Sequence, residues 1–124
     1  MAQSFGLSAR TMQFAVAVFR FCRELPKTEE TPDIVRQFRR AGSAVAANYR
    51  ASRRGRSTAD FVAKIGIVIE EADECAFWLE FLVEIEAVPR ARTAPLAKEA
   101  NELIAILMAS RKTAIGNRQR RLSS

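Results

Sequence analysis

Apolar residues recur along this chain at alternating steps of three and four, the spacing of α-helices that pack against other helices. The pattern is clearest between residues 60 and 87, where the inward row reads Phe61, Ile65, Val68, Ala72, Cys75, Leu79 and Leu82. A second row lies beside it, at Val62, Ile69, Ala76 and Val83. Two adjacent rows make a stripe wider than a single partner requires, so we expect this helix to contact at least two neighbours. Ile67, Trp78 and Ile85 fall on another face, which covers either a third neighbour or a subunit interface.

The same spacing predicts four helices, over about 8–25, 32–53, 58–87 and 95–115. Residues 1–116 therefore make one all-α domain of four helices, and the turn around residues 54–57 indicates a hairpin of two antiparallel helices. We expect residues 1–6 to be a frayed segment that precedes the first helix. The basic residues 117–124 follow Gly116, which reads as a helix stop, and we expect this tail to be disordered.

Local signals mark where the helices begin and end. Thr31 reads as an N-cap followed by proline at the first helical position. Ser57 and Asp60 fit a capping box, and Gly55 suits the left-handed position after a helix end. Thr93 lies in a short basic turn and is the expected cap of the fourth helix.

The second helix carries the inward row Ile34, Phe38, Ala41, Val45 and then Asn48. Small residues fill most of the stretch from 41 to 47, which lets a neighbouring backbone approach closely. A buried amide costs free energy unless it is hydrogen-bonded. We therefore expect Asn48 to cap or bridge a neighbouring helix, with a ligand role as the alternative.

The composition is that of one globular domain. Of the 124 residues, 48% are hydrophobic and 27% are charged. No apolar run reaches the roughly 20 residues of a membrane helix, and the run from Phe14 to Phe19 is short for a signal-peptide core. We therefore expect a cytoplasmic protein without membrane contact. Cys22 and Cys75 are single cysteines on apolar faces, where we expect them to pack in the core.

The net charge of +6 is distributed unevenly. Residues 1–31 carry +1, residues 32–57 carry +6, residues 58–89 carry −7 and residues 90–124 carry +6. One acidic helix thus lies between two basic segments. The two charged faces either pair with each other, within or between subunits, or leave part of the arginine face free to meet phosphate.

The residues that could meet nucleic acid are arginines of the second helix, the following turn and the tail. They are Arg36, Arg39, Arg40, Arg50, Arg53, Arg54, Arg56, Arg118, Arg120 and Arg121. The residues that could form a structural polar network lie on the facing helices. They are Asn48, Glu70, Glu71, Asp73 and Glu74.

Catalytic chemistry is not indicated. Carboxylate-bridged metal sites in four-helix bundles use Glu-x-x-His motifs on two helices, and this chain has no histidine. No glycine-rich phosphate loop and no nucleophile with a base partner occur. We expect a protein without metal or cofactor that is not an enzyme, although a carboxylate base at Glu70 or Glu74 stays open.

Several short motifs together carry a family resemblance. They are Arg39-Arg40-Ala41-Gly42-Ser43, Asn48-Tyr49-Arg50-Ala51, Arg56-Ser57, Asp60-Phe61, Glu70-Glu71-Ala72-Asp73-Glu74 and Trp78-Leu79. In this order and spacing the chain resembles the four-helix-bundle family of bacterial ribosomal intervening-sequence proteins. The accessory variability determinant proteins of diversity-generating retroelements look like relatives. The chain departs from the common Asn-Ile-Ala-Glu-Gly pattern of that family at residues 48–52, which places it on a side branch.

The resemblance implies an up-down-up-down antiparallel four-helix bundle that assembles as a homo-pentamer. It also implies a basic surface that meets RNA, DNA or a reverse transcriptase partner. Two hypotheses follow. The first is a non-enzymatic oligomeric bundle that binds nucleic acid through its arginine faces and tail. The alternative is a protein-interaction scaffold whose arginine and acidic faces pair between subunits, with no role in nucleic-acid binding.

Overall fold

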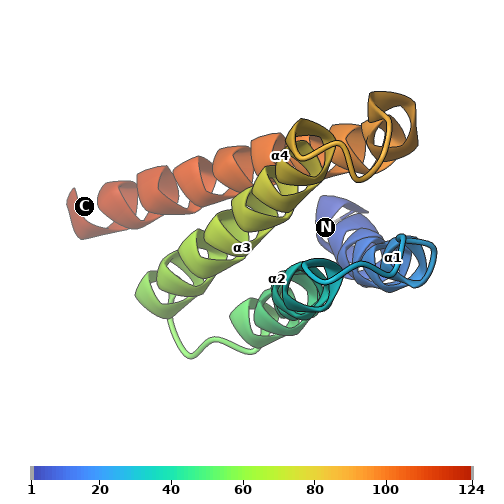
Figure 1. Ribbon diagram of the computed structural model, residues 1–124. Coiled ribbons are helices and arrows are strands. Elements are labelled where there is room, and N and C mark those ends of the chain that lie inside the picture. The colour runs from blue at the N-terminus through green and yellow to red at the C-terminus, as the bar shows by residue number, and fades with distance from the viewer. Residues whose placement is uncertain (1, 124) are drawn as a thin grey trace.

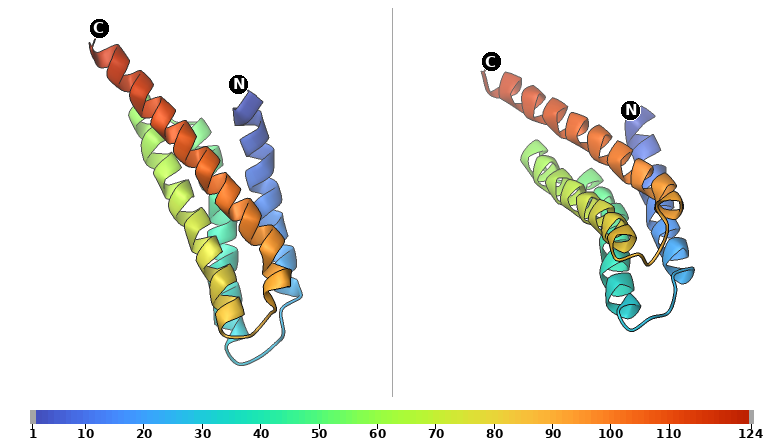
Figure 2. Two further views of the ribbon diagram at one scale, coloured as in Figure 1. Left: turned by 90° about the horizontal axis from the view of Figure 1, so that it is seen from above. Right: turned by 45° about the horizontal axis from the view of Figure 1, so that its top comes forward.

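The computed structural model describes residues 2–123. It contains four helices, α1 (Ala2–Arg23), α2 (Thr31–Arg53), α3 (Thr58–Glu84) and α4 (Arg90–Ser123), and no strand occurs within this range. Successive helices run in opposite directions, which confirms the predicted all-α, up-down-up-down bundle (Figure 1). α2 packs between α1 and α3, α4 packs on α3, and α1 touches α4 only sparingly. α1 and α4 diverge toward the end of the bundle that carries both termini (Figure 2).

The core follows the predicted inward rows. On α3, the row from Ile65 to Leu82 is at most 1% exposed, with Phe61 half-buried at its start. On α2, the buried position after Val45 is Tyr49, which is 3% exposed, and not the predicted Asn48. Asn48 is half-buried and its Nδ2 donates to Ala44 O at 2.9 Å within the same helix, so it bridges no neighbouring helix in that bond.

The predicted close approach of a backbone occurs at Gly42, where α2 crosses α1. A Cβ atom added there would lie 2.8 Å from Val18 Cγ1 and 2.9 Å from Val18 Cβ. Those distances are shorter than the 3.5–4.0 Å of a favourable carbon contact. The absence of a side chain at Gly42 therefore allows α1 and α2 to pack this closely.

Local hydrogen bonds stabilise the turn between α2 and α3. Ser57 Oγ accepts from Asp60 N at 3.1 Å, as the capping box predicts, while Asp60 Oδ2 accepts from Arg56 N at 3.2 Å. Gly55 does not have the predicted left-handed conformation, because no glycine here has a positive φ. Its amide instead donates to Ser52 O at 3.2 Å, which closes the turn.

Two other helix starts differ from prediction. α1 begins at Ala2, before the predicted start at residue 8, so residues 2–6 of the predicted frayed segment belong to the helix. Thr31 is already inside α2, and its Oγ1 donates to Pro26 O at 2.7 Å, so it ties down the preceding loop and does not cap the helix.

The fourth helix is longer at both ends than the sequence predicts. It begins at Arg90, and Thr93 is buried inside it, where its Oγ1 donates to Arg90 O at 3.1 Å. Pro95 lies near the start, where a proline removes only one intrahelical hydrogen bond. The tail predicted to be disordered is helical to Ser123, because residues after Gly116 are mostly good helix formers and a single glycine costs only about 1 kcal/mol.

The third helix ends at Glu84, three residues before the predicted end at 87, in a motif that closes its last carbonyls. Ala87 N donates to Leu82 O and Glu86 N donates to Val83 O, both at 2.9 Å. This is the Schellman pattern, which places Glu86 in the left-handed region with a φ of 62°.

Candidate nucleic-acid interface

The structure divides the ten predicted arginines into two groups. Three lie in the first half of α2, and seven lie where the α2–α3 turn meets the last turns of α4. The first group is Arg36, Arg39 and Arg40; the second is Arg50, Arg53, Arg54, Arg56, Arg118, Arg120 and Arg121. The arginines of α2 therefore form two clusters, one in its first half and one at its C-terminal end.

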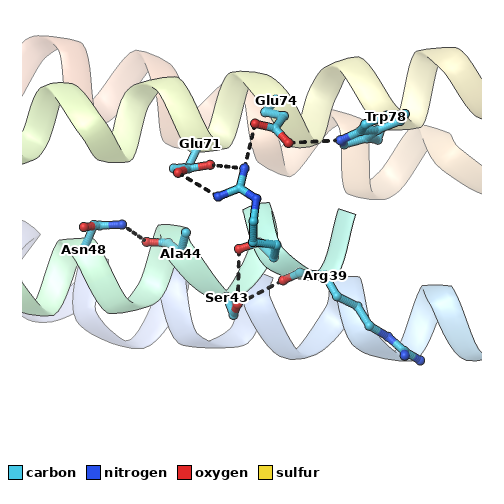
Figure 3. Close-up of polar contacts among 8 residues, drawn as sticks. Arg39, Ser43, Ala44, Asn48, Glu71, Glu74 and Trp78 are labelled. Atoms are coloured by element: carbon cyan, nitrogen blue, oxygen red, sulfur yellow. Dashed lines mark hydrogen bonds and ion pairs between the residues drawn. The ribbon is translucent and has the colours of Figure 1, made fainter. Parts of the chain in front are cut away.

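Arg40 is engaged inside its own chain. Its guanidinium donates to Glu71 at 3.0 and 3.2 Å and to Glu74 at 2.8 Å, across the α2–α3 interface (Figure 3). Glu74 also accepts from Trp78 Nε1 at 3.2 Å. The hydrogen bonds that Arg40 donates to Glu71 and Glu74 raise the pKa of Arg40 further above its usual range. Arg40 thus joins α2 to α3.

Arg39 and Arg36 have other surroundings. Arg39 points away from the Arg40 network (Figure 3), and its guanidinium lies 5.3 Å from the Phe19 ring centroid on α1, a cation–π contact. Arg36 forms an exposed ion pair with Asp33 at 3.2 Å, one turn earlier on the same helix. None of the three arginines lies near the α2–α3 turn.

The second group, together with Lys64 of α3, forms what we call the basic end. It consists of Arg50, Arg53, Arg54, Arg56, Lys64, Arg118, Arg120 and Arg121, from α2, the turn, α3 and α4. The antiparallel topology brings these segments together, because α2 ends where α3 begins and α4 returns to the same end (Figure 2). Arg121 Nη2 donates to Thr58 Oγ1 at 2.7 Å, which holds the end of α4 against the start of α3.

The electrostatics of this end are one-sided. In the segments 50–64 and 118–121, Asp60 is the one acid among eight basic residues. Lys64 Nζ lies 3.0 Å from Asp60 Oδ2, and this hydrogen bond together with the Arg56 amide lowers the pKa of Asp60. Within residues 2–123, no carboxylate forms an ion pair with Arg50, Arg53 or Arg54. Their charge is therefore available to an external anion.

Two hollows flank the turn. The α2 hollow, of about 630 Å³, is lined by Ala47, Arg50, Ala51, Arg54, Arg56, Ser57, Asp60 and Lys64. The α4 hollow, of about 470 Å³, is lined by Ser52, Arg53, Gly55, Arg56, Ser57, Thr58, Phe61, Ala114, Asn117 and Arg121. Arg56 and Ser57 line both, so a ligand could pass from one hollow to the other over the turn.

The predicted polar network is brought together only in part. Glu71 and Glu74 meet at Arg40, and Asn48 bonds within α2. Glu70 borders an apolar hollow with Ile69 and Met108, and Asp73 borders a different groove between α3 and α4. Glu70 and Asp73 therefore line separate hollows, and both lie apart from the Glu71 and Glu74 pair at Arg40.

The described part of the chain offers little for other chemistry. No group of three His, Cys, Asp or Glu side chains between residues 2 and 123 is placed to hold a metal ion. Burial raises the pKa of Cys22 to about 11 and that of Cys75 to about 12, so both thiols are poor nucleophiles. None of the helices in this range is long and apolar enough to cross a membrane.

Two residues beside the α2–α3 turn, Lys64 and Phe61, were not predicted as site residues from the sequence. Lys64 is the single basic residue of the acidic helix, and its position four residues after Asp60 is the signal that could have placed it at the start of α3. Phe61 was assigned to the core, yet it also lines the α4 hollow beside Arg53 and Arg121.

Fold and charge together define a small all-α bundle with one strongly basic end, and no catalytic family is indicated. The chain belongs to the 23S rRNA-intervening sequence protein family, which matches it over residues 5–109. Among solved structures it is similar to a protein of unknown function from the S23 ribosomal protein family of Bacteroides thetaiotaomicron. That similarity has a TM-score of 0.80 and 26% sequence identity, and covers 88% of this chain and 97% of the other. Comparison with curated proteins found no match.

Proposed function

We propose that this protein binds nucleic acid, RNA or DNA, through the basic end and catalyses no reaction. The observation that carries the proposal is the convergence of eight basic side chains from three helices and a turn around a single carboxylate. Phosphate groups are the common ligand of such surfaces, because neutralising them releases counterions. The family name refers to an intervening sequence of 23S rRNA, which makes RNA the first probe to test.

The opposite end of the bundle provides a contrast. There Arg20, Arg23, Lys27, Arg90 and Arg92 lie among Glu24, Glu29, Glu30, Glu80, Glu84 and Glu86. Arg92 approaches Glu24 at 3.4 Å, and Arg90 approaches Glu84 at 4.0 Å. Mixed charge of this kind does not attract a polyanion, so binding should be confined to the basic end.

The test is fluorescence anisotropy with short RNA, single-stranded DNA and duplex DNA over a salt series. The logarithm of the affinity should fall linearly with the logarithm of the salt concentration. Arg50→Gln, Arg53→Gln and Arg54→Gln in one variant should weaken binding and reduce the magnitude of that slope by about 2 to 3. These three side chains are exposed, so the variant should keep its helix content in circular dichroism.

A matched control removes the same charge from the other end: Arg20→Gln, Arg23→Gln and Lys27→Gln, all exposed. It should bind with a nearly unchanged salt slope. Equal losses in the two variants would show that only net charge matters and would refute the assignment to the basic end. Absence of binding at ~50 mM salt, where phosphate contacts are strongest, would refute nucleic-acid binding itself.

We further propose that the chain self-associates, as the family resemblance to pentamers implies. The supporting observation is a row of exposed apolar side chains on α1: Met12 at 49%, Val16 at 39% and Phe19 at 37%. In the alternative, the charged faces of α2 and α3 pair between subunits. That alternative is disfavoured because Arg40 already pairs with Glu71 and Glu74 inside one chain.

Light scattering coupled to size exclusion tests this second proposal. The wild type should have a mass near five times 13.8 kDa, and Val16→Glu should lower it. Met108→Glu is the matched variant on α4, because Met108 is 57% exposed. A monomeric wild type would refute self-association, and loss of assembly in Met108→Glu alone would refute its placement on α1.

A further inference from the structure

The α4 hollow differs from the α2 hollow in having an aromatic wall. Phe61, from the first turn of α3, lines it together with Arg53 from α2 and Arg121 from α4. Phe61 is half-buried, so part of its ring is open to the hollow. Thr58 Oγ1 accepts from Arg121, which holds that guanidinium beside the hollow.

A hollow lined by an aromatic ring and by guanidinium groups suits one chemical class in particular. Unpaired bases stack on aromatic side chains and on guanidinium planes, while the neighbouring phosphates take charge-assisted hydrogen bonds from arginine. The volume of about 470 Å³ is within the range of small-molecule sites, and it can admit one nucleotide. We propose that the α4 hollow binds a single unpaired nucleotide, with its base against Phe61 and its phosphate between Arg53 and Arg121.

The α2 hollow extends this site. It has no aromatic residue among its lining side chains, and its cations are Arg50, Arg54, Arg56 and Lys64. Since Arg56 and Ser57 line both hollows, the backbone that leaves the α4 hollow meets further cations on the other side of the turn. The inferred ligand is therefore a single-stranded segment or an unpaired end, in preference to a blunt duplex. The inference rests on the proposed nucleic-acid binding and specifies the part that binds.

The stacking is tested by changing Phe61 in the protein and removing the bases from the ligand, separately and together. The wild type and Phe61→Leu are titrated by anisotropy with a 12-nucleotide single strand and with an abasic strand of the same length and charge. On the wild type, removing the bases should weaken binding about five- to tenfold, the low end of the effect of stacking one base. On Phe61→Leu, which keeps an apolar side chain of similar size against the core, removal of the bases should have much less effect.

A fluorescence readout does not depend on how well Phe61→Leu folds. Trp78→Phe removes the single tryptophan, and Phe61→Trp in that background places a new one at the hollow. The normal strand should quench its emission at saturation, whereas the abasic strand should bind without quenching.

Equal affinities of the wild type for both strands, with a steep salt dependence, would overturn the nucleotide site and leave phosphate binding at the basic end intact. Tighter binding of a blunt duplex than of the single strand would do the same. If none of the nucleic acids binds at low salt, the proposed function fails and the nucleotide site fails with it.

Discussion

Replacing Gly42 with alanine should destabilise the bundle, although alanine is the better helix former. The added Cβ would meet three atoms of Val18, at 2.8, 2.9 and 3.0 Å. One of them is Val18 Cβ, which rotation about χ1 does not move, so the contact can be relieved only by a shift of the α1 or α2 backbone. Such a shift would loosen the packing around Val18, which is fully buried.

The magnitude follows from two opposing terms. Glycine in a helix interior is less favourable than alanine by about 1 kcal/mol. Overpacking a close-packed core costs about 1–3 kcal/mol, and the rigid contact with a branched side chain favours the upper part of that range. The net loss for Gly42→Ala is therefore about 1–2 kcal/mol.

Gly66→Ala is the matched control, because Gly66 is also inside a helix but its added Cβ would meet only Arg111 Nε, at an ordinary 3.8 Å. It should stabilise the protein by up to about 1 kcal/mol. Urea unfolding followed by circular dichroism, at one protein concentration, gives both values. If Gly42→Ala proved as stabilising as Gly66→Ala, the packing argument would be wrong. Val18→Ala should reduce the penalty at Gly42, because two of the three contacting atoms disappear.

Three other predictions concern single residues. Glu86→Gly should raise the free energy of unfolding by roughly 0.5–1 kcal/mol, because glycine adopts a positive φ without strain; a lower urea midpoint would contradict this. Ser57→Ala should lower the free energy of unfolding by about 1 kcal/mol through loss of the α3 cap, a change that Ser57→Asp should largely avoid. Because burial raises the pKa of Cys22 to about 11 and of Cys75 to about 12, unfolded thiols lose protons first and stability should fall as the pH rises above 9. Iodoacetamide at pH 8 should accordingly label both cysteines only as fast as the chain unfolds, and faster labelling of the native protein would refute their burial.

The inward row of α3 was predictable because burial there depends on a local period. A helix with partners on two sides must bury adjacent rows, and the positions from Ile65 to Leu82 follow from spacing alone. The capping of α3 by Ser57 was predictable for the same reason, since the cap and its amide are three residues apart.

The charged groups were less predictable, because their partners lie on other helices. Which carboxylates meet Arg40 depends on the register between α2 and α3, and that register is set by packing. The α4 hollow likewise needs the end of α4 to lie beside Thr58, and the sequence pattern predicted disorder there. Proline and glycine usually interrupt helices, yet α4 continues through Pro95 and Gly116, because the residues around them favour a helix.

The packing order of the helices has a consequence for how the chain folds. Each helix packs mainly on the helix next to it in the sequence, and α1 adds only sparse contact with α4. Most contacts can therefore form between neighbouring segments without closing a long loop, so folding should be complete within milliseconds. Within one chain, α1 is held mainly by α2, whereas α3 is held on two sides. In the Val16→Glu variant, which should not assemble, the backbone amides of α1 should therefore exchange with deuterium sooner than those of α3.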